Sequence, residues 1–355
     1  MPAKSSRTLD FFSLYEKFVN DSKKGRRLQP NGKRISVGTA DNYYYTFLLL
    51  KRFCQEKQFD LRIRPARRLN KRELTTEKNY WKKFYKRFTD YLYDELGYFD
   101  NYIGVTVKNI KTFFNYLNKD LAMGAGDFHK QFYVRKEEIA IFPLLPEELN
   151  FLIHDETFAD SLKPRMREVK DFFVFGCTVA LRFSDLVNLQ KSNVRVVGGN
   201  SYLSVRSIKT STDSLVKLPP YAIDIINRHQ KLKKRLLPKF NVVNLNQYIK
   251  QLLEQAGFTH PVHVTRGKRG VAIQQKKEQQ QTLRFCDVAT THTMRRTAIT
   301  TMLSLGVPEQ VVRKISGHSS SGKKFYRYVL WAQTYQDMEM EKMYASLQEK
   351  KLQTA

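Results

Sequence analysis

Apolar side chains in the first third of the chain recur at spacings of three and four residues. Residues 9–20 and 36–58 show this helical period, and residues 75–96 and 105–117 repeat it with aromatic side chains at many apolar positions. Alternation of apolar and polar positions, which indicates a half-buried strand, is scarce here. Because amphipathic helices bury their apolar faces against one another, we expect a small all-α bundle that ends near Asp120.

A polar stretch follows this predicted bundle and separates it from the rest of the chain. It contains two glycines and the charged run Arg135–Glu138, a composition typical of a linker. Pro146 is followed by two glutamates, and this combination is characteristic of the first turn of a new helix. We therefore predict a helical domain over residues 1–120, a linker over 121–143 and a second domain over 144–355.

The second domain mixes strand and helix patterns. Residues 202–208 and 214–218 flank a polar turn, which predicts a β-hairpin. Shorter strands are predicted at residues 262–264 and 272–273. The helical period predicts further helices at residues 167–179, 181–189, 293–305, 308–316 and 338–353. The predicted fold class is mainly α with a small β component, in which an N-terminal helical bundle precedes an α+β domain.

Charge narrows the range of partners. The 355 residues include 62 Lys and Arg against 34 Asp and Glu, a formal net charge of +28. Residues 1–140 contribute +13 and the remainder +15, so the excess is not confined to one basic tail. A field of this sign attracts polyanions, and nucleic acid is the commonest of them. A ribosomal-type protein, or a surface that is merely basic, is the simpler alternative.

Cysteine usage and the absence of apolar runs indicate the compartment. Cys54, Cys177 and Cys286 are widely separated and form neither a disulfide framework nor a zinc-binding spacing. This usage fits a reducing cytoplasm. The polar N-terminus has no signal-peptide pattern, and no apolar run approaches membrane-spanning length. We expect a soluble, cytoplasmic protein with no membrane partner.

Two histidines and an arginine near the C-terminus form candidate chemistry without a metal-ligand pattern. His292 and Arg295 are three residues apart at the start of a predicted helix, so they share a face, and the helix N-terminus favours a phosphate. His318 follows Gly317, directly after a short predicted helix. Taken singly, each motif is more common by chance as surface charge or as a helix cap.

An arginine between two apolar predicted helices adds to this set. Arg182 is followed three residues later by Asp185, which is typical of a buried cation held by its own carboxylate. We expect Asp185 to orient the guanidinium and leave its N–H groups for phosphate oxygens. An ordinary salt bridge within the domain explains the pair as well.

The order of these motifs is similar to that of the tyrosine recombinase (phage integrase) family. Along the chain the motifs are Leu181–Leu186, His292–Thr297, Ser316–His318 and a later tyrosine. The resemblance covers the chain from about Leu144 to its end, and the helical first domain is similar to the family's core-binding domain by architecture. Four motifs in the right order are far more specific than any one alone.

In that family, two arginines, a hairpin lysine, two histidine-type groups and a tyrosine form the active site. The resemblance implies that the catalytic residues here are Arg182, Lys209, His292, Arg295, His318 and Tyr328, with Asp185 and Arg296 in support. Lys209 is preferred to Arg206 on the same hairpin because the pattern after it ends, as in the family, with Leu218-Pro219. Arg296 stands where the family often has histidine.

Three tyrosines follow the last histidine. The spacing from His318 to Tyr328 is one residue longer than the usual family pattern, and Tyr326 falls one residue short. The Phe-x-x-Tyr ending from Phe325 to Tyr328 matches better, so Tyr328 is preferred and Tyr326 is the alternative nucleophile. Tyr335 is a distant third. Each could also be a packing tyrosine in a chain that has 19 of them.

The resemblance implies a site-specific recombinase that cleaves and rejoins DNA through a 3′-phosphotyrosyl intermediate, without metal, ATP or another cofactor. The implied partner is double-stranded DNA with specific recombination sites, bound by a dimer at each site and a tetramer in synapsis, in a prokaryotic cytoplasm at the nucleoid. Length favours the integrase of a mobile element. A type IB topoisomerase, which acts as a monomer, and a catalytically silent DNA-binding protein are the alternatives.

Overall fold

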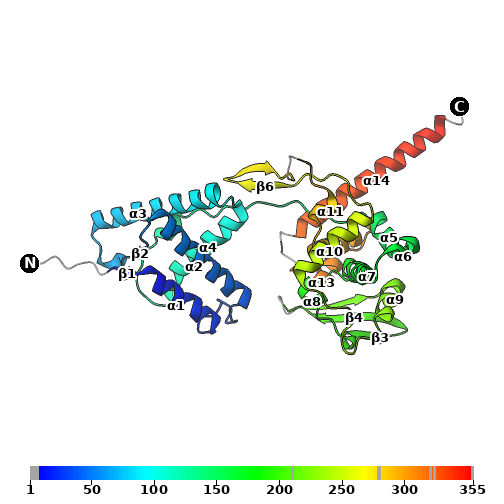
Figure 1. Cartoon of the computed structure of the whole chain (residues 1–355), viewed down its shortest axis with the longest axis horizontal. Coiled ribbons are helices and arrows are strands. Elements are labelled where there is room, and N and C mark those ends of the chain that lie inside the picture. Colours follow the sequence, from blue (N-terminus) through cyan, green and yellow to red (C-terminus); the bar gives the residue numbers. More distant parts are fainter. Residues whose placement is uncertain (1–7, 209–211, 278–280, 320–321, 323–324, 353–355) are drawn as a thin grey trace, which may run out of the picture. The chain divides into compact units, whose positions relative to one another are not determined.

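The computed structural model describes residues 8–208, 212–277, 281–319, 322 and 325–352 (Figure 1). The chain divides into two compact units, unit 1 with residues Met1–Ile139 and Thr265–Gln275, and unit 2 with Ala140–Val264 and Lys276–Ala355. The predicted fold class, mainly α with small sheets, is confirmed. The domain limits inferred from the sequence stay a prediction. None of the described helices is long and apolar enough to cross a membrane.

Unit 1 is built around the four helices that the sequence predicted. They are α1 (Phe11–Lys23), α2 (Val37–Lys57), α3 (Lys71–Asp90) and α4 (Asp100–Lys119) (Figure 1). A π-helical turn, η2 (Tyr91–Glu95), continues α3. The third helix begins at Lys71, before its predicted start, because Asn70 and Glu73 form a capping box. Each side chain accepts the other residue's backbone N–H at 2.9 Å.

The core of unit 1 is largely aromatic. Phe11 lies edge-on to Phe113 with ring centroids 5.1 Å apart, and Trp81 lies edge-on to Phe114 at 4.9 Å. Such pairs add about 0.5–1.5 kcal/mol each beyond the burial of the rings. Phe132 is buried in the same core, so part of the segment predicted as a linker packs on this unit. The short elements of unit 1 are β1 (Leu9–Asp10), β2 (Arg62–Ile63), η1 (Ala66–Arg68) and η3 (Phe128–Gln131).

A β-hairpin from the second half of the chain also belongs to unit 1. Its strands, β6 (Thr265–Lys268) and β7 (Val271–Gln274), pair antiparallel, and β6 contacts α4 (Figure 1). The strand predicted at residues 272–273 is confirmed within β7. The strand predicted at residues 262–264 is wrong by three residues, because the ladder starts at Thr265.

Two carboxylates of unit 1 hold this hairpin. Glu137, with a side chain only 6% exposed, accepts hydrogen bonds from Arg266 at 2.9 Å and from the backbone N–H of Gly267. Asp100 accepts from the backbone N–H of Gly270 at 2.9 Å. A Cβ at Gly267 would lie 2.9 Å from Asp100 Oδ2, so the close approach requires glycine. All four residues of β7 are exposed, and specific polar contacts therefore anchor the hairpin.

Unit 2 combines a three-stranded sheet with a set of helices. In chain order its elements are α5 (Pro146–His154), α6 (Glu156–Ser161), α7 (Pro164–Val179), α8 (Phe183–Leu186), η4 (Lys191–Asn193), β3 (Val194–Val197), β4 (Asn200–Arg206), β5 (Asp213–Lys217), α9 (Pro220–Arg228), α10 (Val242–Gln255), α11 (Phe285–Val288), α12 (Thr291–Ser304), α13 (Glu309–Ser316) and α14 (Tyr326–Leu352). The sheet is antiparallel in the order β3-β4-β5, and the β4–β5 hairpin is the predicted one.

Several predicted elements of unit 2 differ from the observed ones. The sequence did not predict β3, α9 or α10. The helix predicted at residues 181–189 is the single turn α8, because Arg182 at its start is extended. The terminal helix predicted at residues 338–353 is the last part of α14, which already begins at Tyr326.

Helix α7 lies in the core of unit 2, and α12 packs closely against it. Gly176 of α7 allows this approach, since a Cβ there would lie 2.5 Å from the sulfur of Met294 on α12. Helix α7 ends where Ala180 adopts the left-handed conformation with φ 55°. The turn places the carbonyl of Ala180 within hydrogen-bond distance of Arg295 on α12.

Candidate active site

Four helix ends of unit 2 carry the residues that converge. Arg182 precedes α8, Arg295 lies in the second turn of α12, His318 follows α13, and Tyr328 lies in the first turn of α14. Helix α12 contacts α7, α13 and α14. The packing of these helices therefore brings together side chains that are far apart along the chain.

Arg295 is a buried cation whose hydrogen-bond partners in the described part of the chain are neutral. It is 5% exposed and donates to the carbonyls of Ala180 at 2.7 Å and Ser316 at 2.6 Å. The imidazole Nδ1 of His318 lies 3.3 Å from its Nη2. Burial, and then the nearby charge of Arg182, lowers the pKa of Arg295 to about 10, so it stays cationic at neutral pH. A buried cation with neutral partners favours an anionic ligand.

His318 is a neutral imidazole beside this cation. Burial lowers its pKa to about 3, and the charges of Arg295 and Arg182 act in the same direction. Its Nδ1 lies 2.8 Å from Ser316 Oγ, and that hydroxyl is also 2.7 Å from the carbonyl of Val312. If the hydroxyl donates to Nδ1, the proton of the neutral imidazole is on Nε2. If the hydroxyl donates to the Val312 carbonyl instead, Nδ1 can carry the proton and Nε2 presents a lone pair.

Arg182 connects to Asp185 through Ser207, a residue that no sequence motif marks. Nη1 of Arg182 donates to Ser207 Oγ at 3.2 Å, and Ser207 Oγ donates to Asp185 Oδ2 at 3.0 Å. The backbone N–H of Ile208 donates to the other oxygen of Asp185 at 2.9 Å. The orienting contact that we expected to be direct therefore passes through the hairpin. Asp185, which is 4% exposed, fixes the arginine and the end of β4 together.

The predicted lysine is carried by the connection between β4 and β5. Lys209 lies outside the described residues and stays a prediction from the family resemblance. Arg206, its competitor, is the exposed last residue of β4 and faces Asp213 across the ladder. The backbone N–H of Ser207 donates to the carbonyl of Thr212 at 2.9 Å, which holds the base of the hairpin closed.

Among the three candidate tyrosines, Tyr328 lies beside the imidazole. It is 4% exposed, and its ring centroid is 5.9 Å from that of His318. Tyr326 is 60% exposed. Tyr335 donates to the carboxylate of Glu147 at 2.6 Å. Of these three, Tyr328 is therefore the one that the structure places beside the other candidate residues.

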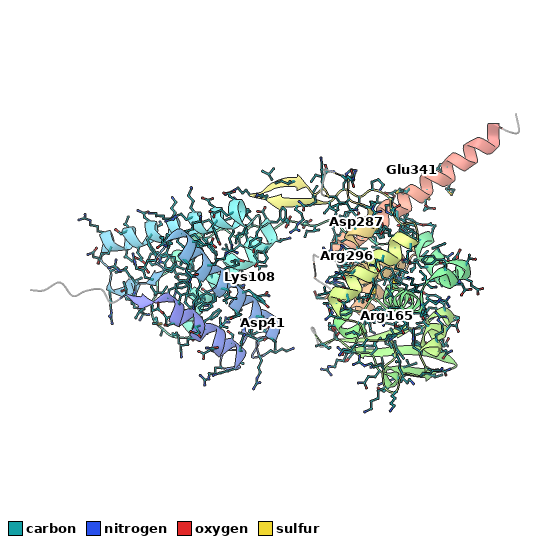
Figure 2. The ribbon with its side chains drawn as sticks, in the orientation of Figure 1. Asp41, Lys108, Arg165, Asp287, Arg296 and Glu341 are labelled. Atoms are coloured by element: carbon teal, nitrogen blue, oxygen red, sulfur yellow. The ribbon has the colours of Figure 1, made fainter. Side chains whose placement is uncertain are left out.

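His292 and Arg296 stand on either side of Arg295 along α12. His292 is the exposed second residue of the helix, one turn before Arg295, and its backbone N–H donates to the capping side chain of Thr290 at 3.3 Å. Arg296, labelled in Figure 2, is partly buried. Burial lowers the pKa of Arg296, and the neighbouring Tyr328 opposes this effect. The guanidinium of Arg296 is therefore near the candidate nucleophile, as is that of Arg327, whose Nη2 lies 3.5 Å from Tyr328 Oη.

The assembled groups suit an anion with several oxygen atoms. Arg182, Arg295 and Arg296 present planar forks of N–H donors, the geometry that binds phosphate oxygens in pairs. Their partial burial strengthens charge interactions relative to water. Within the described ranges, no group of three or more His, Cys, Asp or Glu side chains is arranged to hold a metal ion.

Comparison with known proteins adds evidence at the level of the fold. The profile of the phage integrase family matches residues 151–332, just over half of the chain, and this range includes all the candidate residues from Arg182 to Tyr328. No curated protein sequence matches the chain.

Several solved structures have a fold similar to that of this chain over most of its length. A lambda integrase dimer bound to a COC′ core site has a TM-score of 0.58 at 12% identity, covering 92% of this chain and 78% of that one. A lambda integrase tetramer bound to a Holliday junction gives 0.56 at 12%, with 92% and 78% covered. The Tn1549 transposon integrase in complex with circular intermediate DNA gives 0.54 at 14%, with 90% and 95% covered. At these identities the likeness shows the fold.

Proposed function

Because the chain belongs to the phage integrase family, we propose that it is a site-specific recombinase that cleaves and rejoins DNA through a tyrosine. The observation that carries this proposal is the buried guanidinium of Arg295, which has neutral hydrogen-bond partners and lies beside His318 and close to Tyr328. A phosphodiester would supply the negative charge that these partners lack.

In the proposed cleavage step, Tyr328 Oη attacks the phosphorus of one DNA strand. Arg182 and Arg295 bind the nonbridging oxygens and stabilise the charge that develops on the five-coordinate phosphorus. His318 donates Nε2–H to the same oxygens in the tautomer in which Ser316 donates to Nδ1. Free tyrosine has a pKa of about 10, so its proton must leave during the attack. His292 is the proposed acceptor.

The bond from phosphorus to the 5′ oxygen breaks in this step. Lys209 is the proposed donor of the proton to that oxygen, by its position in the family pattern. The product is a 3′-phosphotyrosyl ester and a free 5′-hydroxyl. Because the ester keeps the energy of the broken phosphodiester, a 5′-hydroxyl from another strand can reverse the step without ATP.

The proposed partner is duplex DNA with specific recombination sites. The lambda integrase structures contain a dimer on a core site and a tetramer on a Holliday junction. We infer the same assembly here, a dimer at each site and a tetramer when two sites meet. A role as the integrase of a mobile element, in a prokaryotic cytoplasm, is part of this proposal.

Covalent capture from a random pool tests the proposed function and identifies the DNA site at the same time. The protein is incubated with a pool of duplexes that have randomised centres and is then denatured, and DNA that remains bound to protein is sequenced. A duplex selected in this way is then nicked near the cleavage point. After cleavage it loses the short fragment that carries the free 5′-hydroxyl, so the strand cannot be rejoined and the intermediate is trapped. We expect the wild-type protein to form an adduct and Tyr328→Phe to form none.

Tyr326→Phe is the matched control, because it removes the hydroxyl of an exposed tyrosine two residues away. Its adduct should match that of the wild type. If Tyr328→Phe still formed the adduct, the choice of nucleophile would be wrong. If the wild type captured no DNA, or relaxed supercoils as a monomer without joining two sites, the recombinase proposal would fail.

A further inference from the structure

Arg313 braces the main chain at Ser319 and Gly322, two described residues between His318 and Tyr328. It lies in the last turn of α13, and its guanidinium Nη1 donates to the carbonyl of Ser319 at 2.8 Å and reaches the carbonyl of Gly322 at 3.4 Å. Its side chain is 13% exposed. One cation therefore contacts two points of the main chain that follows His318.

The same guanidinium also lies on an aromatic ring of the site. It is 4.1 Å from the ring centroid of Phe325, which is fully buried. The Phe325 ring is edge-on to His318 at 5.2 Å and to Tyr328 at 5.6 Å. Since His318 and Tyr328 also contact each other, the three rings form a closed group. Arg313 covers this group from the side of α13.

We propose that Arg313 is a positioning residue that presents Tyr328 to the phosphate. The inference rests on the recombinase function proposed above. Arg313 does not touch the reacting atoms, and it acts through the Ser319 and Gly322 carbonyls and the Phe325 ring. Displacement of a reacting group by about 1 Å can slow a reaction by about 10²-fold, so loss of the brace should slow the attack by Tyr328.

If Arg313 only stabilised helix α13, its replacement would leave the rate of attack by Tyr328 unchanged. Arg313 also pairs with Glu309 one turn earlier, with Nε 2.6 Å from the carboxylate. Ion pairs at this spacing along a helix contribute only about 0.3–0.5 kcal/mol. Glu309→Gln removes the pair and keeps the brace, and it is therefore the matched control.

The decisive comparison is between Arg313→Met, Arg313→Lys and Glu309→Gln on the captured duplex. We expect Arg313→Met to form the covalent adduct about tenfold to 10²-fold more slowly in single turnover, with unchanged DNA affinity. Arg313→Lys keeps the charge, but an ammonium cannot bond both carbonyls and lie flat on the ring, so it should be slowed nearly as much. Glu309→Gln should react at the wild-type rate.

A reaction that does not use Tyr328 distinguishes a misplaced Tyr328 from disruption of the whole active site. On a nicked duplex whose 3′-phosphate carries a p-nitrophenyl ester, the 5′-hydroxyl attacks phosphorus, nitrophenolate leaves, and the hydroxyl proton passes to solvent. This joining needs the arginine clamp and not Tyr328, so the Arg313 variants should join strands at the rate of Tyr328→Phe.

Two results would overturn the positioning role. One is wild-type adduct formation by Arg313→Met and Arg313→Lys. The other is a parallel loss of adduct formation and of nitrophenyl-ester joining, which would assign Arg313 to the whole site. If Arg313→Met does not fold, Arg313→Lys carries the same comparison. Failure of the wild type to form any adduct would count against the proposed function instead.

Discussion

At the level of single residues, the site combines cations with neutral partners. Arg295 is bonded to two carbonyls and an imidazole, and Arg182 to a hydroxyl. Neither forms an ion pair that is seen in the described part of the chain, and Asp185, the nearby carboxylate, is engaged by Ser207 and by the backbone. This arrangement leaves positive charge at the site, which a phosphate can neutralise.

Replacement of Ser207 tests the relay between Arg182 and Asp185. We expect Ser207→Ala to lower the free energy of unfolding by about 1–2 kcal/mol, because the buried Asp185 and the partly buried Arg182 each lose a hydrogen-bond partner. Adduct formation should slow by about tenfold as Arg182 loses its fixed orientation. Ser214→Ala, at a buried serine of the neighbouring strand β5, is the control. Urea unfolding and single-turnover cleavage measure the two effects, and equal behaviour of both variants would refute the relay.

The pKa of His318 predicts a pH dependence of stability. Burial lowers this pKa to about 3, whereas the unfolded chain gives imidazole a pKa of about 6.5. Between these values the unfolded state binds a proton that the folded state does not, so stability falls as the pH decreases through this window. His318→Asn removes this contribution, which we place at about 1 kcal/mol between pH 7 and 5 after allowance for solvent screening. Urea midpoints with the same pH slope in both proteins would contradict the prediction.

At the level of elements, helix ends position the site and carboxylates anchor the hairpin. Helix α7 ends in the left-handed residue Ala180, and α13 ends in Gly317 with φ 63°, so each chain reversal presents backbone carbonyls to Arg295. The β6–β7 hairpin belongs to unit 1 although its sequence neighbours belong to unit 2. Its contacts are polar, and their strength therefore depends on the charge of Glu137 and Asp100.

Neutralisation of Glu137 should loosen the hairpin. Burial raises the pKa of Glu137, but the hydrogen bonds from Arg266 and Gly267 outweigh burial, and the pKa is lowered overall. The contact between Glu137 and the hairpin is therefore strongest above the usual carboxyl pKa, and it is lost as the pH falls through the lowered pKa. Glu137→Gln should speed amide hydrogen exchange in residues 265–275 by about tenfold or more. Glu138→Gln, an exposed glutamate one residue later, is the control. Unchanged exchange in Glu137→Gln would show that other contacts hold the hairpin.

At the level of the whole molecule, positive charge is spread over both halves of the sequence. The net charge of +28 is divided almost equally between residues 1–140 and the remainder. Such a distribution favours contact with a long polyanion by both parts of the chain. In the proposed complex with DNA, we expect phosphate contacts to determine most of the affinity and very little of the sequence preference.

Salt dependence tests this view of the whole molecule. With about 6–10 phosphate contacts, the affinity for duplex DNA should fall by about 10³–10⁵-fold between 50 and 200 mM salt. A titration of the captured duplex, followed by fluorescence anisotropy at several salt concentrations, gives the number of contacts from the slope. A flat dependence would mean that charge contributes little to binding.

The sequence by itself determined the helices of unit 1, the β4–β5 hairpin, the mainly α class and the candidate motifs, because periodicity and motif spacing are local properties of the chain. Only the tertiary structure decided which groups meet. The structure showed the Ser207 relay, the burial of Tyr328 against the exposure of Tyr326, and the place of the β6–β7 hairpin, which depend on packing between residues distant in sequence. The contacts of Arg313 join residues that are closer along the chain, but they too require the fold of the turn after α13. Such packing follows from the fit of whole surfaces, as at Gly176 beside Met294, and no local period encodes it.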